Sequence, residues 1–95
     1  MKIFKELKKL GYIHYSATTI EELDDLPLNS AERISEQALV LRWFREKYGL
    51  DNAVLKDRYV IETQEDLPTW YYGFNTYEEA ELACLRKLIE IVKTK

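Results

Sequence analysis

The chain has 95 residues and a net charge of -3, from 14 basic and 17 acidic side chains. Hydrophobic residues make up 46% and charged residues 33%, which is typical of a globular protein and excludes a disordered or collagen-like chain. This length supports one hydrophobic core, so we predict a single domain over residues 1–95. The mild excess of acid gives no general attraction to phosphate and disfavours nucleic acid as a partner.

Cysteine content and hydropathy give expectations about the compartment. Cys84 is the only cysteine, which excludes an intramolecular disulfide. The longest aliphatic run covers 38–41, far short of the roughly 18–20 residues that span a bilayer. Charged residues interrupt segment 2–10, so it lacks the apolar region of a secretory signal. We therefore expect a cytoplasmic protein with no membrane association.

The first predicted element is a short amphipathic helix at about 2–10. Ile3, Leu7 and Leu10 share one face at helical spacing, with lysines on the outer side. The conformation of residues 12–28 stays open. Within it, Thr19 has a glutamate three residues later, and this capping-box spacing begins a brief helical turn.

A long helix is predicted at about 30–48, with Gly49 placed to end it. A second capping-box spacing, from Asn29, marks its start. Its predicted core stripe, at about 100° per residue, contains Ala31, Ile34, Ala38, Leu41, Phe44 and Tyr48. Leu39 and Trp43 form a second apolar pair on nearly the opposite side, so they are either covered within the domain or exposed for a partner.

Residues 52–63 are predicted to be strand, either continuous or broken into two short pieces at 56–58. Residues 69–74 are the return strand of an antiparallel hairpin that pairs about 58–63 with 69–74. The alternation in the first segment places Ala53, Leu55, Tyr59 and Ile61 on one side. In the return strand it places Trp70, Tyr72 and Phe74 on one side and Thr69 and Tyr71 on the other. We expect one aromatic face of this hairpin to pack on the core.

The last helix is predicted at about 77–93, with an apolar arc wide enough to pack on more than one side. Glu81 projects inside that arc, so its carboxylate must reach solvent or find a polar partner. The predicted fold class is α+β with two layers. A small antiparallel sheet is packed by the helices near 30–48 and 77–93, with the short N-terminal helix beside them.

The residue types that support catalysis are sparse. His14 is the only histidine, and no second soft ligand lies near it for a zinc site. Cys84 falls on the apolar stripe of its helix, where a thiol is usually structural. Three glycines in the whole chain leave no phosphate-binding loop. We therefore expect no enzyme activity, no cofactor and no metal.

The charge distribution favours a protein partner. Between Arg58 and Arg86 there is no lysine or arginine, while acidic and aromatic residues fill the interval. Such a surface lacks the basic groove that accompanies base-stacking aromatic rings in proteins that bind single-stranded nucleic acid. It suits a protein or a basic peptide. Our hypothesis is a non-enzymatic protein-interaction module, binding another protein or a second copy of itself. The predicted contact residues are Leu39 and Trp43, followed by Tyr71, Glu65 and Asp66.

The alternative is a DNA-binding regulator of the winged-helix type, since three helices followed by a hairpin also fit that order. The helix at 30–48 would then read DNA through Arg33, Arg42 and Arg45. The tip of its wing would carry Glu65 and Asp66, which repel the phosphate backbone.

Two segments carry a resemblance: 43–48, with the sequence WFREKY, and 76–92, with the sequence TYEEAELACLRKLIEIV. From about Ala31 onward the chain resembles small uncharacterised proteins carried on bacterial prophages and other mobile elements. The resemblance implies a cytoplasmic accessory protein of phage type. It supplies no activity, cofactor or catalytic residue.

Overall fold

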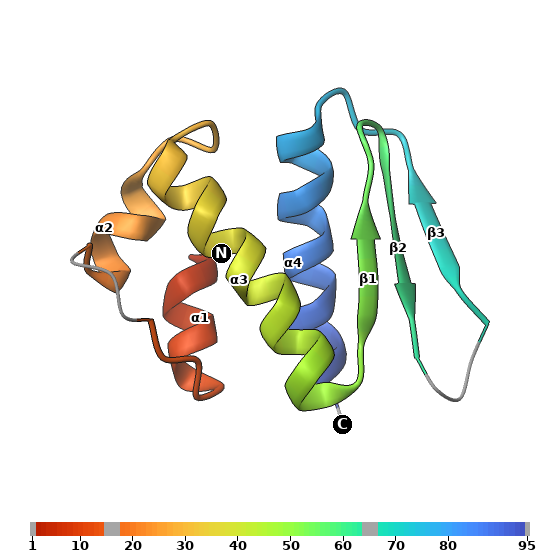
Figure 1. The fold of residues 1–95 in the computed structure, drawn as a ribbon, viewed down its shortest axis with the longest axis horizontal. Coiled ribbons are helices and arrows are strands. Elements are labelled where there is room, and N and C mark those ends of the chain that lie inside the picture. The colour runs from red at the N-terminus through yellow and green to blue at the C-terminus, as the bar shows by residue number, and fades with distance from the viewer. Residues whose placement is uncertain (1, 15–17, 64–66, 95) are drawn as a thin grey trace.

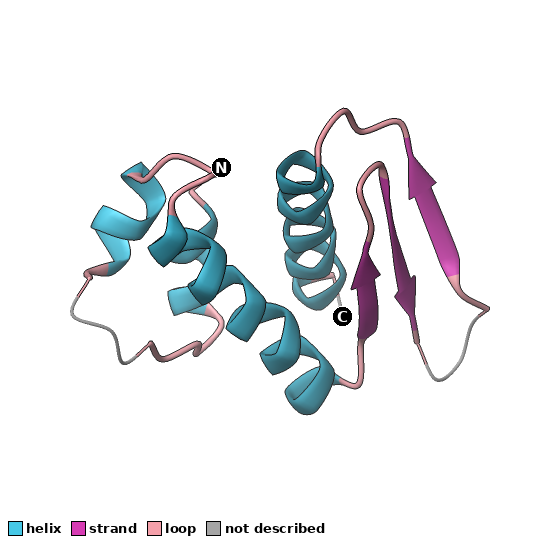
Figure 2. Ribbon diagram, turned by 45° about the horizontal axis from the view of Figure 1, so that its top comes forward, coloured by secondary structure: helices cyan, strands magenta, loops and turns pink. Residues whose placement is uncertain are grey.

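The computed structural model describes residues 2–14, 18–63 and 67–94 (Figure 1). The elements in chain order are α1 (Ile3–Lys9), α2 (Ile20–Asp25), α3 (Ala31–Tyr48), β1 (Asp51–Val54), β2 (Arg58–Glu62), β3 (Thr69–Tyr72) and α4 (Tyr77–Lys93). The helices lie on one side of a three-stranded antiparallel sheet, and α4 lies along that sheet (Figure 2). The predicted α+β fold class is confirmed.

The sheet has the order β1-β2-β3, so the predicted segment 52–63 forms two strands, the alternative with a break near 56–58. A tight turn separates them, closed by the Leu55 N–H, which donates to the Arg58 carbonyl at 2.8 Å. Because the chain reverses there, Ala53 lies opposite Val60 rather than on the face of Tyr59. Ala53 and Leu55 are exposed whereas Tyr59 and Ile61 are buried, and the prediction that all four share one side was wrong.

The aromatic strand β3 is oriented differently from the prediction. Trp70 and Tyr72 point away from the helices and are 43% and 62% exposed. The neighbouring Tyr71 points inward and stacks on the Tyr59 ring at 4.7 Å between centroids. Phe74 also reaches that ring, at 5.6 Å, because Gly73 adopts a φ of +99° and breaks the alternation. Trp70, Tyr72 and Phe74 therefore do not share a core face, and that prediction was wrong.

Helix α3 buries a different stripe from the predicted one. Its buried side chains include Arg33, Gln37, Val40 and Phe44, which follow helical spacing. Of the predicted stripe only Phe44 is buried; Ile34, Leu41 and Tyr48 are partly buried, and Ala31 and Ala38 are exposed. Polar side chains can occupy the core face because they bond to one another, as shown by Arg33 Nε donating to Gln37 at 2.8 Å.

The ends of the helices follow the predictions unevenly. Gly49 ends α3 in the left-handed conformation, with a φ of +66°, and Thr19 begins α2 with the predicted capping box. The predicted box from Asn29 was wrong, because Ser30 is the N-cap residue of α3 and its hydroxyl bonds to Glu32. Ser30 can thus satisfy its hydroxyl without contacting the helix backbone.

Helix α1 is held by side chains from further along the chain. The Asp24 carboxylate accepts hydrogen bonds from the backbone N–H groups of Phe4 and Lys5, at 2.8 and 3.0 Å. Arg33 in turn donates to the carbonyls of Leu23, Asp24 and Leu26 at the end of α2. These bonds attach both short helices to the start of α3.

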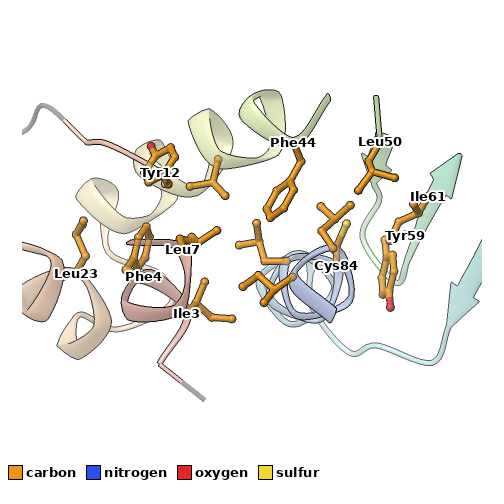
Figure 3. Close-up of a cluster of buried hydrophobic side chains, with 14 of the residues drawn as sticks. Ile3, Phe4, Leu7, Tyr12, Leu23, Phe44, Leu50, Tyr59, Ile61 and Cys84 are labelled. Atoms are coloured by element: carbon orange, nitrogen blue, oxygen red, sulfur yellow. The ribbon is translucent and has the colours of Figure 1, made fainter. Parts of the chain in front are cut away.

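The buried side chains form one cluster that runs from α1 to the sheet (Figure 3). Ile3, Phe4 and Leu7 supply its α1 end, and Tyr59 and Ile61 supply its sheet end. Helix α4 lies between them and contacts α1, α3, β1 and β2, as its wide apolar arc predicts. Phe44 sits in the middle of the cluster, facing the α4 residues (Figure 3).

Candidate functional site

Two surfaces of the described residues combine exposed apolar side chains with a defined shape. We call the first the α3 groove, lined by Tyr12, Ile13, His14, Glu36, Leu39, Arg42, Trp43 and Glu46. We call the second the outer sheet face, the side of the sheet that points away from α4. Its side chains are Asp51, Ala53, Leu55, Arg58, Val60, Glu62, Trp70 and Tyr72.

The α3 groove brings together the predicted pair Leu39 and Trp43, in an open depression of about 450 Å³. The two side chains are buried to different extents. Leu39 is 54% exposed, whereas Trp43 is partly buried and packs against the core. Its ring makes edge-on contacts with Tyr12, Phe44 and Tyr48 at centroid distances of 5.3, 5.0 and 5.5 Å. Trp43 therefore contributes to packing within the chain, and Leu39 is the exposed member of the pair.

The charged groups of the α3 groove bond to groups within the chain. The Tyr12 hydroxyl donates to the buried Glu36 carboxylate, and burial followed by this bond raises the pKa of Tyr12 above its usual range. Arg42 Nε bonds to Glu46 at 2.8 Å. An incoming charged ligand would have to displace these contacts, which makes the groove a poor site for one.

The outer sheet face carries a continuous aromatic and aliphatic patch. Trp70 and Tyr72 stack along β3 with centroids 6.3 Å apart, and the register places Val60 beside Trp70. The Arg58 guanidinium lies over the Tyr72 ring at 5.1 Å and also bonds to Asp57 at 2.9 Å. Large aromatic side chains next to an arginine are the residue types enriched where proteins bind one another.

The two edges of the sheet differ. On the β1 edge, Arg45 donates to the Asn52 carbonyl at 3.3 Å and pairs with Asp51 at 3.4 Å, so α3 contacts the start of this edge. Strand β3 pairs with β2 only, within the part of the chain that the structure describes. Its other edge therefore presents backbone N–H and carbonyl groups that can accept another strand.

The remaining predicted contact residues are divided. Tyr71 lies on the helix side of the sheet, stacked on Tyr59, with the Lys87 ammonium over its ring at 5.8 Å. Glu65 and Asp66 lie outside the described residues. The predicted set thus falls on both sides of the molecule, and the most exposed aromatic residues near Tyr71 are its neighbours Trp70 and Tyr72.

The single cysteine, Cys84, lies fully buried among the core side chains (Figure 3). Burial, with a smaller contribution from the nearby Glu81 carboxylate, raises the pKa of this thiol to about 12. Glu81 itself is buried on α4, where it accepts a hydrogen bond from the Gln37 side-chain amide at 2.6 Å. These environments are those of structural groups rather than of an activated nucleophile.

We expect the Cys84 thiol to resist modification in the folded protein. At pH 8 a thiol with a pKa of about 12 is almost entirely protonated, and the core shields it from a reagent. A chromogenic disulfide reagent should therefore react slowly in buffer and stoichiometrically in denaturant. Equally fast reaction in both conditions would show that Cys84 is accessible.

None of the described helices combines the length and hydrophobicity that crossing a membrane requires. Comparisons of the chain with protein-family models, curated proteins and solved structures found no match.

Proposed function

We propose that the protein is a non-enzymatic protein-interaction module that contacts its partner with the outer sheet face. The observation that carries this proposal is the exposure of Trp70 and Tyr72, 43% and 62%, on a sheet whose other face packs on α4. Exposed aromatic side chains lose favourable free energy in water and recover it when a partner covers them. The cytoplasmic, phage-type setting implied by the sequence resemblance is part of the same proposal.

The composition of the patch supports this use. Trp70, Tyr72 and Val60 form its centre, while the charged Asp51 and Glu62 lie opposite each other on the neighbouring strands. An apolar centre with charged residues beside it is the usual arrangement of a protein-binding surface. The strands also fix the positions of the side chains before binding, so little conformational entropy is lost on association.

The winged-helix alternative has less support from the arginine contacts. Arg33 is buried and donates to carbonyls at the end of α2. Its guanidinium is therefore not accessible to a DNA phosphate. Arg42 pairs with Glu46, and Arg45 pairs with Asp51. The carboxylates beside these two exposed arginines offset part of their attraction to phosphate, so the contacts favour the protein-interaction proposal.

Site-specific photo-cross-linking tests the proposal. A photo-reactive amino acid in place of Tyr72 is expected to give a covalent adduct with another polypeptide when the native cell is irradiated. The matched control carries the same group in place of Glu21, an exposed residue of α2 on the far side of the molecule from the sheet (Figure 1). It is expected to give no adduct.

A third position distinguishes the two surfaces. An adduct from Leu39 without one from Tyr72 would move the contact to the α3 groove and contradict the outer sheet face. The absence of adducts from both positions would contradict the interaction module itself.

A further inference from the structure

We infer that the partner is a second copy of this chain, joined at the open edge of the sheet by antiparallel pairing of β3 with β3, so that Trp70 and Tyr72 of the outer sheet face meet their counterparts side by side across the axis. The two sheets then form one six-stranded sheet with a two-fold axis at Tyr71. This inference rests on the proposed function and names its partner. Three observations carry it: one open sheet edge, a strand without charge, and a register that matches aromatic side chains across the axis.

The first observation is the asymmetry of the sheet edges. Arg45 occupies one carbonyl of the β1 edge by bonding to Asn52. Nothing among the described residues does the same for β3, whose sequence TWYY also lacks the charges that usually protect an exposed edge. The open edge of β3 is short, with four residues, and it can accept another strand because pairing satisfies its outward backbone groups.

The second observation is the distribution of charge. Two copies that each carry a net charge of -3 repel one another in general. Residues 69–72 carry no charge, so this segment can face its own copy without placing like charges opposite one another. A strongly charged peptide would find no counter-charge on β3 itself. Pairing β3 with its own copy therefore adds no repulsion between charged side chains at the contact itself.

The third observation is the register. Residues directly opposite one another in an antiparallel pair project to the same face of the sheet. The helices of both copies therefore lie on one side only if each outer-face residue of β3 is opposite an outer-face residue of the second copy. With Tyr71 opposite its own copy, Trp70 faces Tyr72 of the second copy, and both lie on the outer face. A shift of one residue would set Trp70 against Tyr71 and put the helices of the two copies on opposite sides.

The other registers that keep the helices of both copies on one side form weaker backbone pairing. Centring the pair on Trp70 places Tyr72 opposite Pro68, which has no N–H to donate. Centring it on Tyr72 extends the pairing through Gly73, whose φ of +99° departs from strand geometry. In the register centred on Tyr71, residues 70–72 of each copy pair only with residues 70–72 of the other, and Gly73 is met only by Thr69 at the end of the strand.

This register extends contacts that each copy already makes. Within a copy, Tyr59 stacks on Tyr71, and across the axis the two Tyr71 side chains become neighbours, so four tyrosines form one row on the inner face. On the outer face Val60 and Trp70 of one copy continue into Tyr72 and Arg58 of the other. Aromatic cross-strand pairs of this kind stabilise a sheet.

A pair of cysteine variants tests the register. Trp70→Cys and Tyr72→Cys alter exposed side chains and leave the core intact. Directly opposite residues have Cα atoms about 4.5–5.5 Å apart, within the range that a disulfide bridges. Mixing the two variants under mild oxidation should therefore give a disulfide-linked dimer of one copy of each. Either variant alone should give little, since its two cysteines would be about 8 Å apart.

The matched control replaces Trp70→Cys with Leu55→Cys, which is exposed on the outer face but follows the opposite edge strand. It should not cross-link to Tyr72→Cys, and the buried Cys84 should not contribute. Light scattering of the wild-type chain over a concentration series should give a mass twice 11.3 kDa at its upper end. A wild-type monomer throughout, or equal cross-linking of the control, would overturn the inference.

The adduct formed from Tyr72 in the cell separates the two proposals. An adduct of twice the chain mass supports both. An adduct with a different polypeptide overturns the second copy and leaves the interaction module standing. Without any adduct from Tyr72, the outer sheet face itself is contradicted.

Discussion

Replacing Phe44 by alanine is expected to lower the free energy of unfolding by about 3–5 kcal/mol, the usual cost of truncating a buried phenylalanine. Phe44 has no exposed surface and lies in the middle of the core cluster (Figure 3). Its ring contacts those of Trp43 and Tyr48, so the truncation leaves a cavity and removes two aromatic contacts. Urea denaturation followed by circular dichroism measures the loss.

Leu39→Ala is the matched control, because it truncates an apolar side chain of the same helix that is 54% exposed. Its expected effect is within about 0.5 kcal/mol, as for other surface substitutions. If Leu39→Ala destabilised the chain as much as Phe44→Ala, the α3 groove would be covered by the chain or by a second copy rather than open to solvent.

Gln37→Leu should have an effect of similar size by a different mechanism. The Gln37 amide donates to Glu81 and accepts from Arg33, at 2.6 and 2.8 Å. Both of these partners are buried. Leucine has nearly the same volume but leaves both charged groups without that partner. We expect a loss of about 3 kcal/mol, because a hydrogen bond to a charged group contributes about 1.5–3 kcal/mol and Arg33 keeps its bonds to the carbonyls at the end of α2.

A double-mutant cycle identifies the cause of that loss. Glu81→Leu removes the carboxylate that Gln37 satisfies, so the double variant should be destabilised by less than the sum of the single variants. Strict additivity would show that the amide and the carboxylate do not interact. The cost of Gln37→Leu would then have to arise from packing alone.

The sequence predicts the helices better than it predicts which of their faces are buried. The spacing of apolar residues, Gly49 and the capping box from Thr19 indicate α3 and α2 because each signal acts over a few residues. The core face of α3 could not be predicted in the same way. Arg33 and Gln37 are buried because bonding partners come from α2 and α4, and those contacts join residues far apart in the sequence.

The candidate site illustrates the same limit. Alternation along 69–72 separates Trp70 and Tyr72 from Tyr71, which was predicted. Which of the two sides faces the helices depends on how the strand pairs with β2, and both sides are aromatic. Hydrophobicity therefore could not decide between them. The open edge of β3 is likewise a consequence of strand order, which the pattern of one strand does not contain.

The bonds that hold α1 and α2 have a consequence for how the protein opens. An isolated helix shorter than roughly 12–15 residues is marginal in water, and α1 has 7 residues. Its first N–H groups bond to Asp24, and the chain around Asp24 is held by Arg33. If the hydrogen bonds of Arg33 break, the end of α2 loses its support, and Asp24 no longer caps the first N–H groups of α1. We therefore expect α1 and α2 to lose their order together when the Arg33 contacts are lost.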